Sequence, residues 1–538
     1  MNNKQKIYFF SEKDVEGNKD MFSLLGGKGA NIAEMCSLKL PVPPGFTITT
    51  EECVSYLKEK KLSPALKRDI EKNIKKVESV SGKLFGGDDP LLLSVRSGAP
   101  VSMPGMMETV LNIGLTQKTI PLLIKKTKNE KFVYDSYRRF IMMYSDVVME
   151  KGLRKNKTGQ PIRDQMEKLL DQMKKKNGYK NDSAVSSESW EGLAKQYLGL
   201  YEKTFNEQFP EDHTEQLLGA VRAVFSSWNG KRAKEYRAFE KIPSKMGTAV
   251  NVQAMVFGNM GTGCGTGVAF TRNPSSGDKS FYGEWLENAQ GEDVVAGVRT
   301  PHPILKKDGS KNSLEHVLPK AFKELNTIRT KLEKHFMDMQ DIEFTVENKK
   351  LWMLQTRRGK RTGMASIKIV TDMVKEKLIT KKEALSRVQP AQIYESLLKN
   401  IKPDSLLENS SISSGLPAGP GASSGSVVFS AEKAEALGKK GRKIILIREE
   451  TSPEDIHGMH YSEGILTSRG GLTSHAALVA RGWGKSCVVG CQDLSIDKRK
   501  RSATIGTHKI KEGDNITLNG STGEIFLGKL PLFQNSME

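Results

Sequence analysis

Short apolar runs, separated by glycine-rich turns and helix-patterned segments, recur along this chain and constrain its fold more than any other feature. Runs of this length are typical of buried β-strands. They occur near the start (IYFF, FTIT, LLLSVRS), between residues 248 and 356 (TAVNVQAMVFG, GTGVAFT, FYGEW, DIEFTV, LWMLQT) and near the end (SVVF, KIILIRE, GILTS, SCVVG, NITLN, GEIFLG). The chain is therefore predicted to be an α/β multidomain protein.

The 538 residues exceed the usual domain length of about 100 to 200 residues several-fold, so several domains are expected. Residues 1–355 are predicted to form one α/β domain with a helical insertion at about 116–240, and its second group of strands is expected to complete the first. Residues 356–407 are a predicted helical linker. Residues 408–426, rich in Ser, Gly and Pro, are typical of a boundary or hinge. They open a compact domain, 408–530, followed by a tail, 531–538.

The net charge of +20 is spread over lysine-rich segments such as KKTKNEK, KKKNGYK and KRKR. These segments lack interleaved aromatic residues and are typical of solvated helix faces, so nucleic-acid binding is not expected. No apolar run approaches the roughly 18 residues of a membrane helix, and the start lacks a secretory signal. A cytoplasmic location is expected, with an organellar one open for a eukaryote. The five scattered cysteines indicate reduced thiols; Cys487 and Cys491 are predicted to lie in the core.

The stretch GGLTSHAALVARG, residues 470–482, places His475 at a predicted helix start directly after a strand. Two glycines allow a tight turn, and Thr473 is the predicted N-cap. Free N–H groups and the helix dipole at this end favour an anion and a neutral imidazole. The small alanines that follow leave room for a bulky charged group. A histidine that only forms a hydrogen bond at a helix start would show the same local pattern.

The stretch DIEFTVENKKLWMLQTRRGKR carries two carboxylates on one predicted strand. Because side chains alternate along a strand, Asp341 and Glu343 share a face opposite the apolar residues. A cation stabilises such a pair, and Mg²⁺ bound to nucleotide phosphates is the usual one. Gln355 and Arg357 on the next strand would add donors for phosphate oxygens. A solvated sheet edge is the alternative.

Two basic residues near the start have surroundings that suit a polyphosphate. Lys28 lies among glycines at the opening of a predicted helix (LLGGKGANIAEM), and Arg96 ends a predicted strand beside small residues (SVRSGAP). Neither segment is a Walker A loop, and the glycine run at 258–270 lacks the helix of a dinucleotide fold. Taken singly, each residue also fits an ordinary surface charge.

In combination these motifs resemble the pyruvate phosphate dikinases, in order, from about residue 4 to residue 528. The matching segments include GGKGANIAEM, SVRSGAPVSMPGMMETVLNIG, GTGVAFTRNP, NAQGEDVVAGVRTP, QDIEFTV, LQTRRGKRT, ETSPEDIHGMH and GILTSRGGLTSHAALVARGWGKSCVVGC. The resemblance implies an ATP-grasp nucleotide-binding domain in residues 1–355, then the linker, then a swivelling phosphohistidine domain in residues 408–530.

The resemblance also implies the chemistry. The family histidine takes the β-phosphoryl group of ATP, while inorganic phosphate accepts the γ-phosphoryl group, giving AMP and pyrophosphate. Mg²⁺ is the implied cofactor, and a monovalent cation is a further candidate. The implied residues are His475 as the catalytic group, Lys28, Arg96, Gln355 and Arg357 for nucleotide and phosphate, Asp341 and Glu343 for the metal, and Thr473 as a candidate regulatory phosphorylation site, as in plant members.

Family members continue into a (β/α)₈ barrel that binds pyruvate and phosphoenolpyruvate, and this sequence ends before it. We therefore expect only the ATP and phosphate half-reaction here, with the phosphoryl group destined for pyruvate on a separate barrel chain or a full-length homologue. Two alternatives stay open: a dikinase or phosphotransferase with another acceptor, as in glucan water dikinases and rifampicin phosphotransferases, and a truncated regulatory or binding paralogue. Cys264 stands where the family usually has serine, which removes a hydroxyl donor. The oligomeric state is open.

Overall fold

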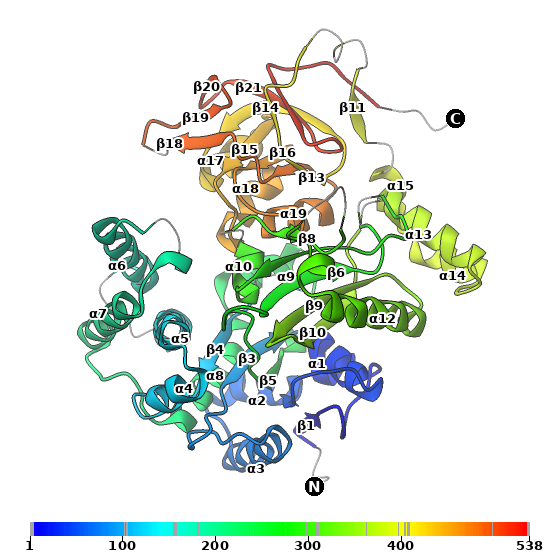
Figure 1. The fold of residues 1–538 in the computed structure, drawn as a ribbon. Helices are drawn as coiled ribbons and strands as arrows, with labels where there is room; N and C mark the ends of the chain where they lie inside the picture. Colours follow the sequence, from blue (N-terminus) through cyan, green and yellow to red (C-terminus); the bar gives the residue numbers. More distant parts are fainter. Residues whose placement is uncertain are drawn as a thin grey trace. The chain divides into compact units, whose positions relative to one another are not determined.

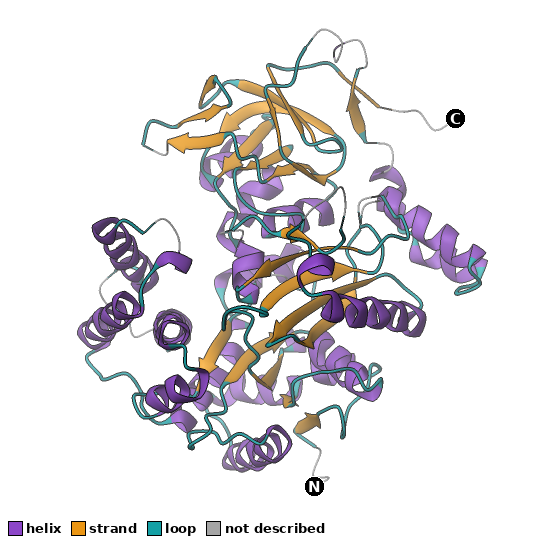
Figure 2. Cartoon of the chain, viewed as in Figure 1, coloured by secondary structure: helices purple, strands orange, loops and turns teal. Residues whose placement is uncertain are grey.

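The computed structural model describes most of the chain, whose helices and strands are shown in Figures 1 and 2. The chain divides into two compact units. The first comprises Met1–Val256 and Trp352–Thr356, the second Phe257–Leu351 and Arg357–Glu538. The described residues are 5–101, 103, 106–153, 156, 159–179, 182–239, 241–274, 276–296, 299–306, 311–361, 363–395, 398–402, 405, 409–497 and 499–534.

Some predicted segments fall partly outside these residues. They are 154, 155, 157, 158, 180, 181 and 240 of the predicted insertion, 362, 396, 397, 403, 404, 406 and 407 of the linker, 408 at the boundary, and 535–538 of the tail. The domain boundaries given above remain predictions.

The first unit contains a five-stranded antiparallel sheet in the order β1-β2-β5-β3-β4. Its strands are β1 (Ile7–Phe10), β2 (Gly45–Ile48), β3 (Leu93–Gly98), β4 (Thr109–Ile113) and β5 (Ala249–Ala254). The last strand, β5, is far from the others in sequence yet lies between β2 and β3. All six of its residues are buried, as expected for a central strand.

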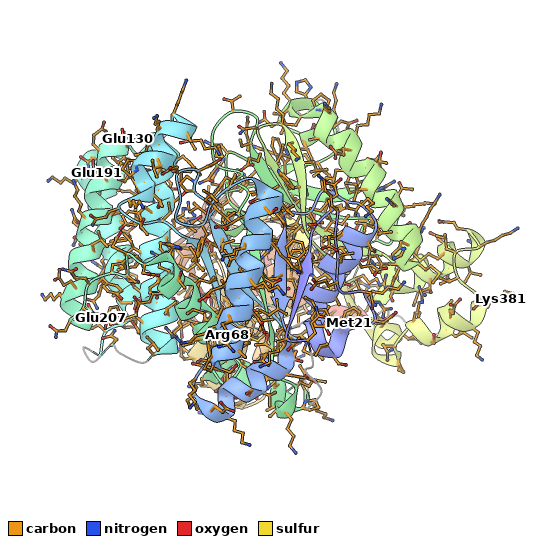
Figure 3. All side chains as sticks on the ribbon, turned by 90° about the horizontal axis from the view of Figure 1, so that it is seen from below. Met21, Arg68, Glu130, Glu191, Glu207 and Lys381 are labelled. Atoms are coloured by element: carbon orange, nitrogen blue, oxygen red, sulfur yellow. The ribbon has the colours of Figure 1, made fainter. Side chains whose placement is uncertain are left out.

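Helices make up most of the rest of the first unit. They are α1 (Phe22–Ser37), α2 (Thr50–Glu59), α3 (Pro64–Ser81), α4 (Thr119–Thr127), α5 (Glu130–Met143), a π-helical segment (Tyr144–Gly152), α6 (Ile162–Asn177), α7 (Ser187–Phe205), α8 (His213–Ser227) and α9 (Lys231–Phe239). Edge-to-face rings from Phe140, Tyr144, Tyr201 and Phe209 join α5 to α7. Exposed charges such as Arg68 and Glu130 project from these helices (Figure 3).

The second unit contains most of a sheet in the order β10-β9-β6-β7-β8, although the Trp352–Thr356 part of β10 is assigned to the first unit. Its strands are β6 (Gly265–Phe270), β7 (Tyr282–Glu287), β8 (His302–Pro303), β9 (Gln340–Glu347) and β10 (Lys350–Arg358). The expectation that these strands complete the first sheet is therefore wrong; only β5 joins it. Strand β6 pairs with β7 and β9 instead, and its glycines allow this close pairing, because a Cβ at Gly265 or Gly267 would meet the rings of Trp285 on β7 or Phe344 on β9.

Helices α10 (Gly291–Ala296), α11 (Leu314–Val317), α12 (Pro319–Phe336), α13 (Gly363–Lys375), α14 (Lys381–Arg387) and α15 (Pro390–Glu395) accompany this sheet. Arg272, which follows β6 and is fully buried, forms ion pairs with Glu333 of α12 at 2.8 Å and Glu376 beside α13 at 2.9 Å. The capping box predicted at Thr380 and Glu383 is confirmed.

The last part of the second unit is built on an eight-stranded sheet, β12-β22-β21-β14-β15-β16-β17-β13, whose β14 to β17 are parallel neighbours. Its strands are β12 (Ser413–Ser414), β13 (Leu416–Gly419), β14 (Ala422–Val428), β15 (Ile444–Arg448), β16 (Gly464–Thr467), β17 (Ser486–Val489), β21 (Asn515–Asn519) and β22 (Glu524–Leu527). The segment expected as a hinge thus supplies strands from Ser413 onward, and small residues there allow close pairing: a Cβ at Gly419 would meet the backbone of Lys485.

Helices α17 (Ala431–Gly438), α18 (Ile456–Tyr461) and α19 (His475–Gly482) pack beside this sheet. Two small sheets complete it, one of β18 (Leu494–Asp497), β19 (Ser502–Ile505) and β20 (His508–Lys511), the other of β11 (Lys399–Ile401) and β23 (Leu532–Gln534). Cys487 and Cys491 form no disulfide and are fully buried, and their burial was predicted. Among the described residues, no helix has both the length and the apolar character needed to cross a membrane.

Candidate active site

His475 is the first residue of α19 and follows the loop after the parallel strand β16. Gly470 in this loop has a φ of +99°, which a residue with a side chain rarely adopts. The predicted N-cap was wrong by one position, because Ser474 accepts the hydrogen bond from the Ala477 amide. The side chain of His475 is only 8% exposed. Its ring is thus placed at a helix start but enclosed by protein.

The imidazole ring is oriented by Thr451, whose Oγ1 lies 3.1 Å from Nδ1 of His475. When Nδ1 carries the proton and donates to this hydroxyl, the ring's lone pair is on Nε2. Nε2 is then the atom with nucleophilic character.

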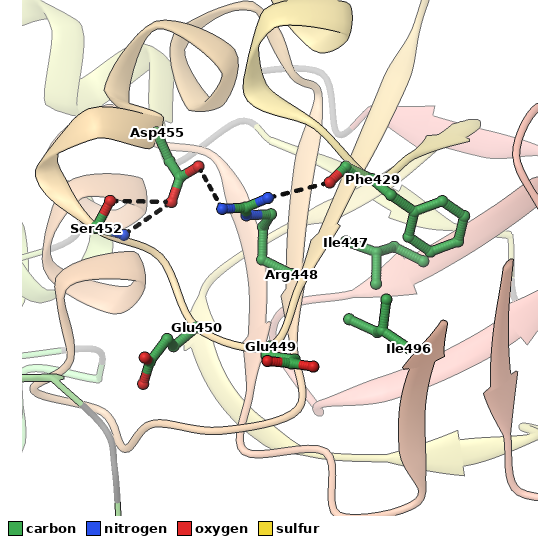
Figure 4. A pocket seen from close by; sticks show the side chains of 8 residues that line it. All are labelled: Phe429, Ile447, Arg448, Glu449, Glu450, Ser452, Asp455 and Ile496. Carbon is green, nitrogen blue, oxygen red and sulfur yellow. Dashed lines mark hydrogen bonds and ion pairs between the residues drawn. The ribbon is translucent and has the colours of Figure 1, made fainter. Parts of the chain in front are cut away.

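The loop that carries Thr451 is held by an ionic and hydrogen-bonded group at the end of β15 (Figure 4). Arg448 pairs with Asp455 at 3.0 Å and donates to the Phe429 carbonyl at 3.2 Å. Asp455 in turn accepts from the Ser452 amide at 2.8 Å. A cavity of about 160 Å³ adjoins these residues. These contacts hold the loop and therefore fix the position of Thr451 relative to His475.

A carboxylate on the other sheet of the same unit binds the loop before His475. Glu284 of β7 accepts hydrogen bonds from the Leu472 amide and from the Thr473 hydroxyl, each at 3.2 Å. Burial raises the pKa of Glu284, and these two donors oppose the rise. A Cβ at Gly471 would lie 2.4 Å from the same carboxylate, so this close approach needs glycine. The histidine loop and β7 are thus in direct contact.

Asp341 and Glu343 lie on β9, separated from β7 by β6. Asp341 is buried and its Oδ2 accepts from Nε of Arg357 at 2.7 Å. Burial raises the pKa of Asp341, Arg357 opposes the rise, and Glu343 adds to it. The structure therefore brings these three predicted residues together, with the arginine partly compensating the carboxylate charge.

The two carboxylates fit a hard cation. Oδ1 of Asp341 is buried and has no hydrogen-bond partner among the described residues. Mg²⁺ commonly takes one or two protein carboxylates and completes its shell with water and phosphate. The described residues contain no cluster of three His, Cys, Asp or Glu side chains arranged to hold a metal, so Asp341 and Glu343 would hold Mg²⁺ only together with such outside ligands.

In the first unit, Lys28 and Arg96 lie on the same side of the sheet. Helix α1 is kinked at Gly26, with a φ of +66°, and Lys28 follows in its second turn. A Cβ at Gly98 would lie 3.3 Å from Cβ of Lys28. Because residues two apart on a strand share a face, Arg96 lies on that side too. Arg96 donates to the side chain of Gln253.

Gln355 belongs to the first unit and Arg357 to the second. The Gln355 side chain is buried, and its Oε1 has no hydrogen-bond partner among the described residues. The structure thus groups the predicted residues into a basic pair in the first unit and a carboxylate–arginine cluster in the second.

Sequence reasoning missed three residues that surround His475 and its loop: Thr451, Glu284 and Arg481. Arg481 is 1% exposed and donates to the Leu472 carbonyl at 3.1 Å. Its place on the same helix as His475 was visible in the sequence, but its burial was not. Glu284 and Thr451 are distant in sequence from the loop that they contact, and no local pattern marks them.

Comparison with known proteins identifies the family. Residues 22–81, 62–321 and 305–378 match the model "Pyruvate phosphate dikinase, AMP/ATP-binding domain", and residues 441–523 match "PEP-utilising enzyme, mobile domain". The chain is 50% identical over 521 residues to the pyruvate, phosphate dikinase of Clostridium symbiosum (96% of this chain, 58% of the relative). It is 48% identical over 535 residues to that of Rhizobium meliloti and over 532 residues to pyruvate, phosphate dikinase 2 of Zea mays, in each case covering 98% of this chain and 58% of the relative.

The chain thus spans somewhat more than half the length of these curated relatives. The family matches extend over both units, from the segment of Lys28 to that of His475. This chain belongs to the pyruvate phosphate dikinase family.

Proposed function

We propose that this chain phosphorylates its own His475 from ATP and inorganic phosphate, with Mg²⁺ as cofactor, and releases AMP and pyrophosphate. One observation carries the proposal beyond family membership. The loop before His475 is bound to Glu284 of β7, in the sheet whose β9 bears Asp341 and Glu343. A histidine nucleophile is therefore attached to the same sheet as the candidate metal ligands.

In the proposed transfer, Nε2 of His475 attacks the β-phosphorus of ATP. The N–P bond forms as the bond from that phosphorus to the oxygen bridging the α-phosphate breaks, and AMP leaves with this oxygen. The γ-phosphoryl group passes to inorganic phosphate as its bond to the β,γ-bridging oxygen breaks, which gives pyrophosphate. The ring proton goes to solvent. Bound Mg²⁺ would neutralise phosphate charge.

The remaining residues are proposed as binding groups. Lys28, Arg96 and Gln355 of the first unit would bind nucleotide and phosphate, and Arg357 of the second would do so once its partner Asp341 takes a metal. We further propose that residues 1–355 form an ATP-grasp domain and that residues 408–530 swivel about the linker, 356–407. Transfer onward to pyruvate would use a barrel domain that lies outside this sequence.

Thr473 is a proposed regulatory phosphorylation site. Its side chain is buried, and its hydroxyl donates to Glu284. A kinase would therefore reach it only when the loop separates from β7, and a phosphate there would face a carboxylate. Modification at this position would oppose the arrangement in which His475 is held to the sheet.

The test uses ATP labelled at the β-phosphorus, with Mg²⁺ and phosphate. Wild type is expected to gain acid-labile label and to form AMP and pyrophosphate in equal amounts. His475→Ala should gain none, whereas His508→Ala, which changes an exposed histidine, should label like wild type. Absence of label on wild type, or equal label on His475→Ala, would refute the proposal.

The products separate this proposal from the alternatives. Pyrophosphate that forms only when phosphate is supplied supports the dikinase half-reaction. Label on His475 with release of free phosphate instead indicates a phosphotransferase with another acceptor. Failure to turn over ATP, with stable binding to a full-length homologue, indicates a regulatory partner.

A further inference from the structure

Arg481 is a buried cation whose guanidinium is mostly unsatisfied. It lies on α19, six residues after His475, and is 1% exposed. Nη2 donates to the Leu472 carbonyl at 3.1 Å, but Nε and Nη1 are buried without a hydrogen-bond partner among the described residues. Buried charged groups are normally paired and hydrogen-bonded, because leaving them unpaired is costly. Such a group is a candidate for binding an outside anion.

A structural arginine in the same unit shows what pairing looks like. Arg272 is also fully buried, yet its guanidinium contacts the carboxylates of Glu333 and Glu376 at 2.8 and 2.9 Å. Arg481 makes no ion pair of this kind within the described part of the chain. The two arginines are matched in burial and differ in whether the protein supplies their anion.

The loop before His475 and two carboxylates lie near Arg481. The charges of Glu284 and Asp341 both act on its guanidinium. Glu284 is occupied by the loop before His475, and Asp341 by Arg357. Arg481 is thus bonded to the histidine loop and lies near enough to Glu284 and Asp341 for their charges to favour its charged form, and its Nε and Nη1 nitrogens have no hydrogen-bond partner among the described residues.

We propose that Arg481 is a phosphoryl-binding residue, which contacts the phosphoryl group in transit to His475 from the helix that carries the histidine. The guanidinium geometry suits the tetrahedral oxygens of a phosphoryl group. Its charge would stabilise negative charge that develops during transfer in a site with little water. This inference deepens the proposed function and rests on it for the identity of the reacting group.

The test compares Arg481→Met with Arg272→Met, using inorganic pyrophosphate with Mg²⁺ as the probe. The first readout is the thermal midpoint of the free protein. If Arg481 awaits a ligand, Arg481→Met should keep or raise the midpoint, because it removes an unsatisfied buried charge. Arg272→Met should lower it, because it leaves two carboxylates without their partner.

The second readout is hydrogen exchange of the peptide 472–482. Pyrophosphate should slow exchange there in wild type and in Arg272→Met but not in Arg481→Met, with Arg481→Lys intermediate. The anion affinity measured from this protection is expected to fall about 10- to 100-fold in Arg481→Met, the range for a charged hydrogen bond. Histidine labelling should slow by about 100-fold.

Two results would overturn the inference: no protection of 472–482 by pyrophosphate in wild type, or equal protection in Arg481→Met. A lowered midpoint in Arg481→Met, together with protection retained in that same variant, would assign a structural role instead. Because these readouts need no turnover, they separate the anion site from the transfer. Protection that depends on Arg481, without label on His475, would refute the proposed reaction and leave the site standing.

Discussion

Removal of the Glu284 carboxylate should release the loop before His475. Glu284→Ala deletes the acceptor for the Leu472 amide and the Thr473 hydroxyl. A hydrogen bond to a charged group contributes about 1.5 to 3 kcal/mol, and 3.2 Å lies at the long end of the normal range. At about 1.5 kcal/mol each, the loss is about 3 kcal/mol, or about 150-fold in the local opening equilibrium.

Hydrogen exchange followed by mass spectrometry measures this opening directly in the peptide 470–478. Glu347→Ala is the matched control, because its carboxylate also accepts a backbone N–H, from Phe257 at 3.0 Å, elsewhere in the same unit. Exchange in 470–478 should accelerate in Glu284→Ala and stay unchanged in Glu347→Ala. Unchanged exchange in Glu284→Ala would show that this contact does not hold the loop.

The same carboxylate gives a pH dependence of known sign. Burial raises the pKa of Glu284 above its ordinary value of 4.5. A raised carboxyl pKa contributes stability that is present below the ordinary pKa and is lost as pH rises through the raised value. Glu284→Gln, which stays neutral, should therefore gain thermal stability relative to wild type as the pH rises above that ordinary value, over the range in which the protein stays folded. A difference that shrinks over this range would contradict the assignment.

Three further predictions concern single positions. Thr451→Val should slow labelling of His475 about tenfold in a quench experiment, since one hydrogen bond of about 0.5–1.5 kcal/mol orients the ring; an unchanged rate would remove the threonine from the site. Burial raises the pKa of Cys487 to about 12, so iodoacetamide at pH 8 should modify it only after unfolding, as peptide mass spectrometry would show. Gly26→Ala would place a Cβ 1.7 Å from the Gly98 carbonyl at a φ of +66°, so urea unfolding should show a loss above about 2 kcal/mol.

The positions of the strands could be predicted from the sequence, but the pairing of these strands could not. Apolar runs located β5, β6 and β9 because a strand must bury side chains at a fixed spacing. Which strands pair depends on contacts between residues far apart, such as Gly267 against the ring of Phe344. The Ser/Gly/Pro-rich segment contains strand β13, and composition does not reveal this, because small residues such as Gly419 allow close strand pairing as well as flexibility.

In the candidate site, too, local patterns placed individual residues, whereas contacts between distant residues were not predicted. Asp341 and Glu343 were placed on one strand face by alternation alone, and His475 by the helix-start pattern around it. Arg357 was expected to bind phosphate, yet in the structure it pairs with Asp341 at 2.7 Å, a contact between two strands that no local pattern specifies. Long-range partners therefore decide which charge is available to a ligand.

The partners of these charged residues suggest how phosphoryl transfer could be controlled. Arg357 compensates Asp341, Glu284 holds the loop before His475, and the Arg481 guanidinium has only the Leu472 carbonyl as its hydrogen-bond partner among the described residues. If Mg²⁺ takes Asp341, Arg357 is released toward phosphate, and a phosphoryl group would then meet two arginines instead of one. Metal binding should thus tighten anion binding at Arg481, and pyrophosphate protection of 472–482 should weaken when Mg²⁺ is chelated. Equal protection with and without the metal would show that the two arginines act independently.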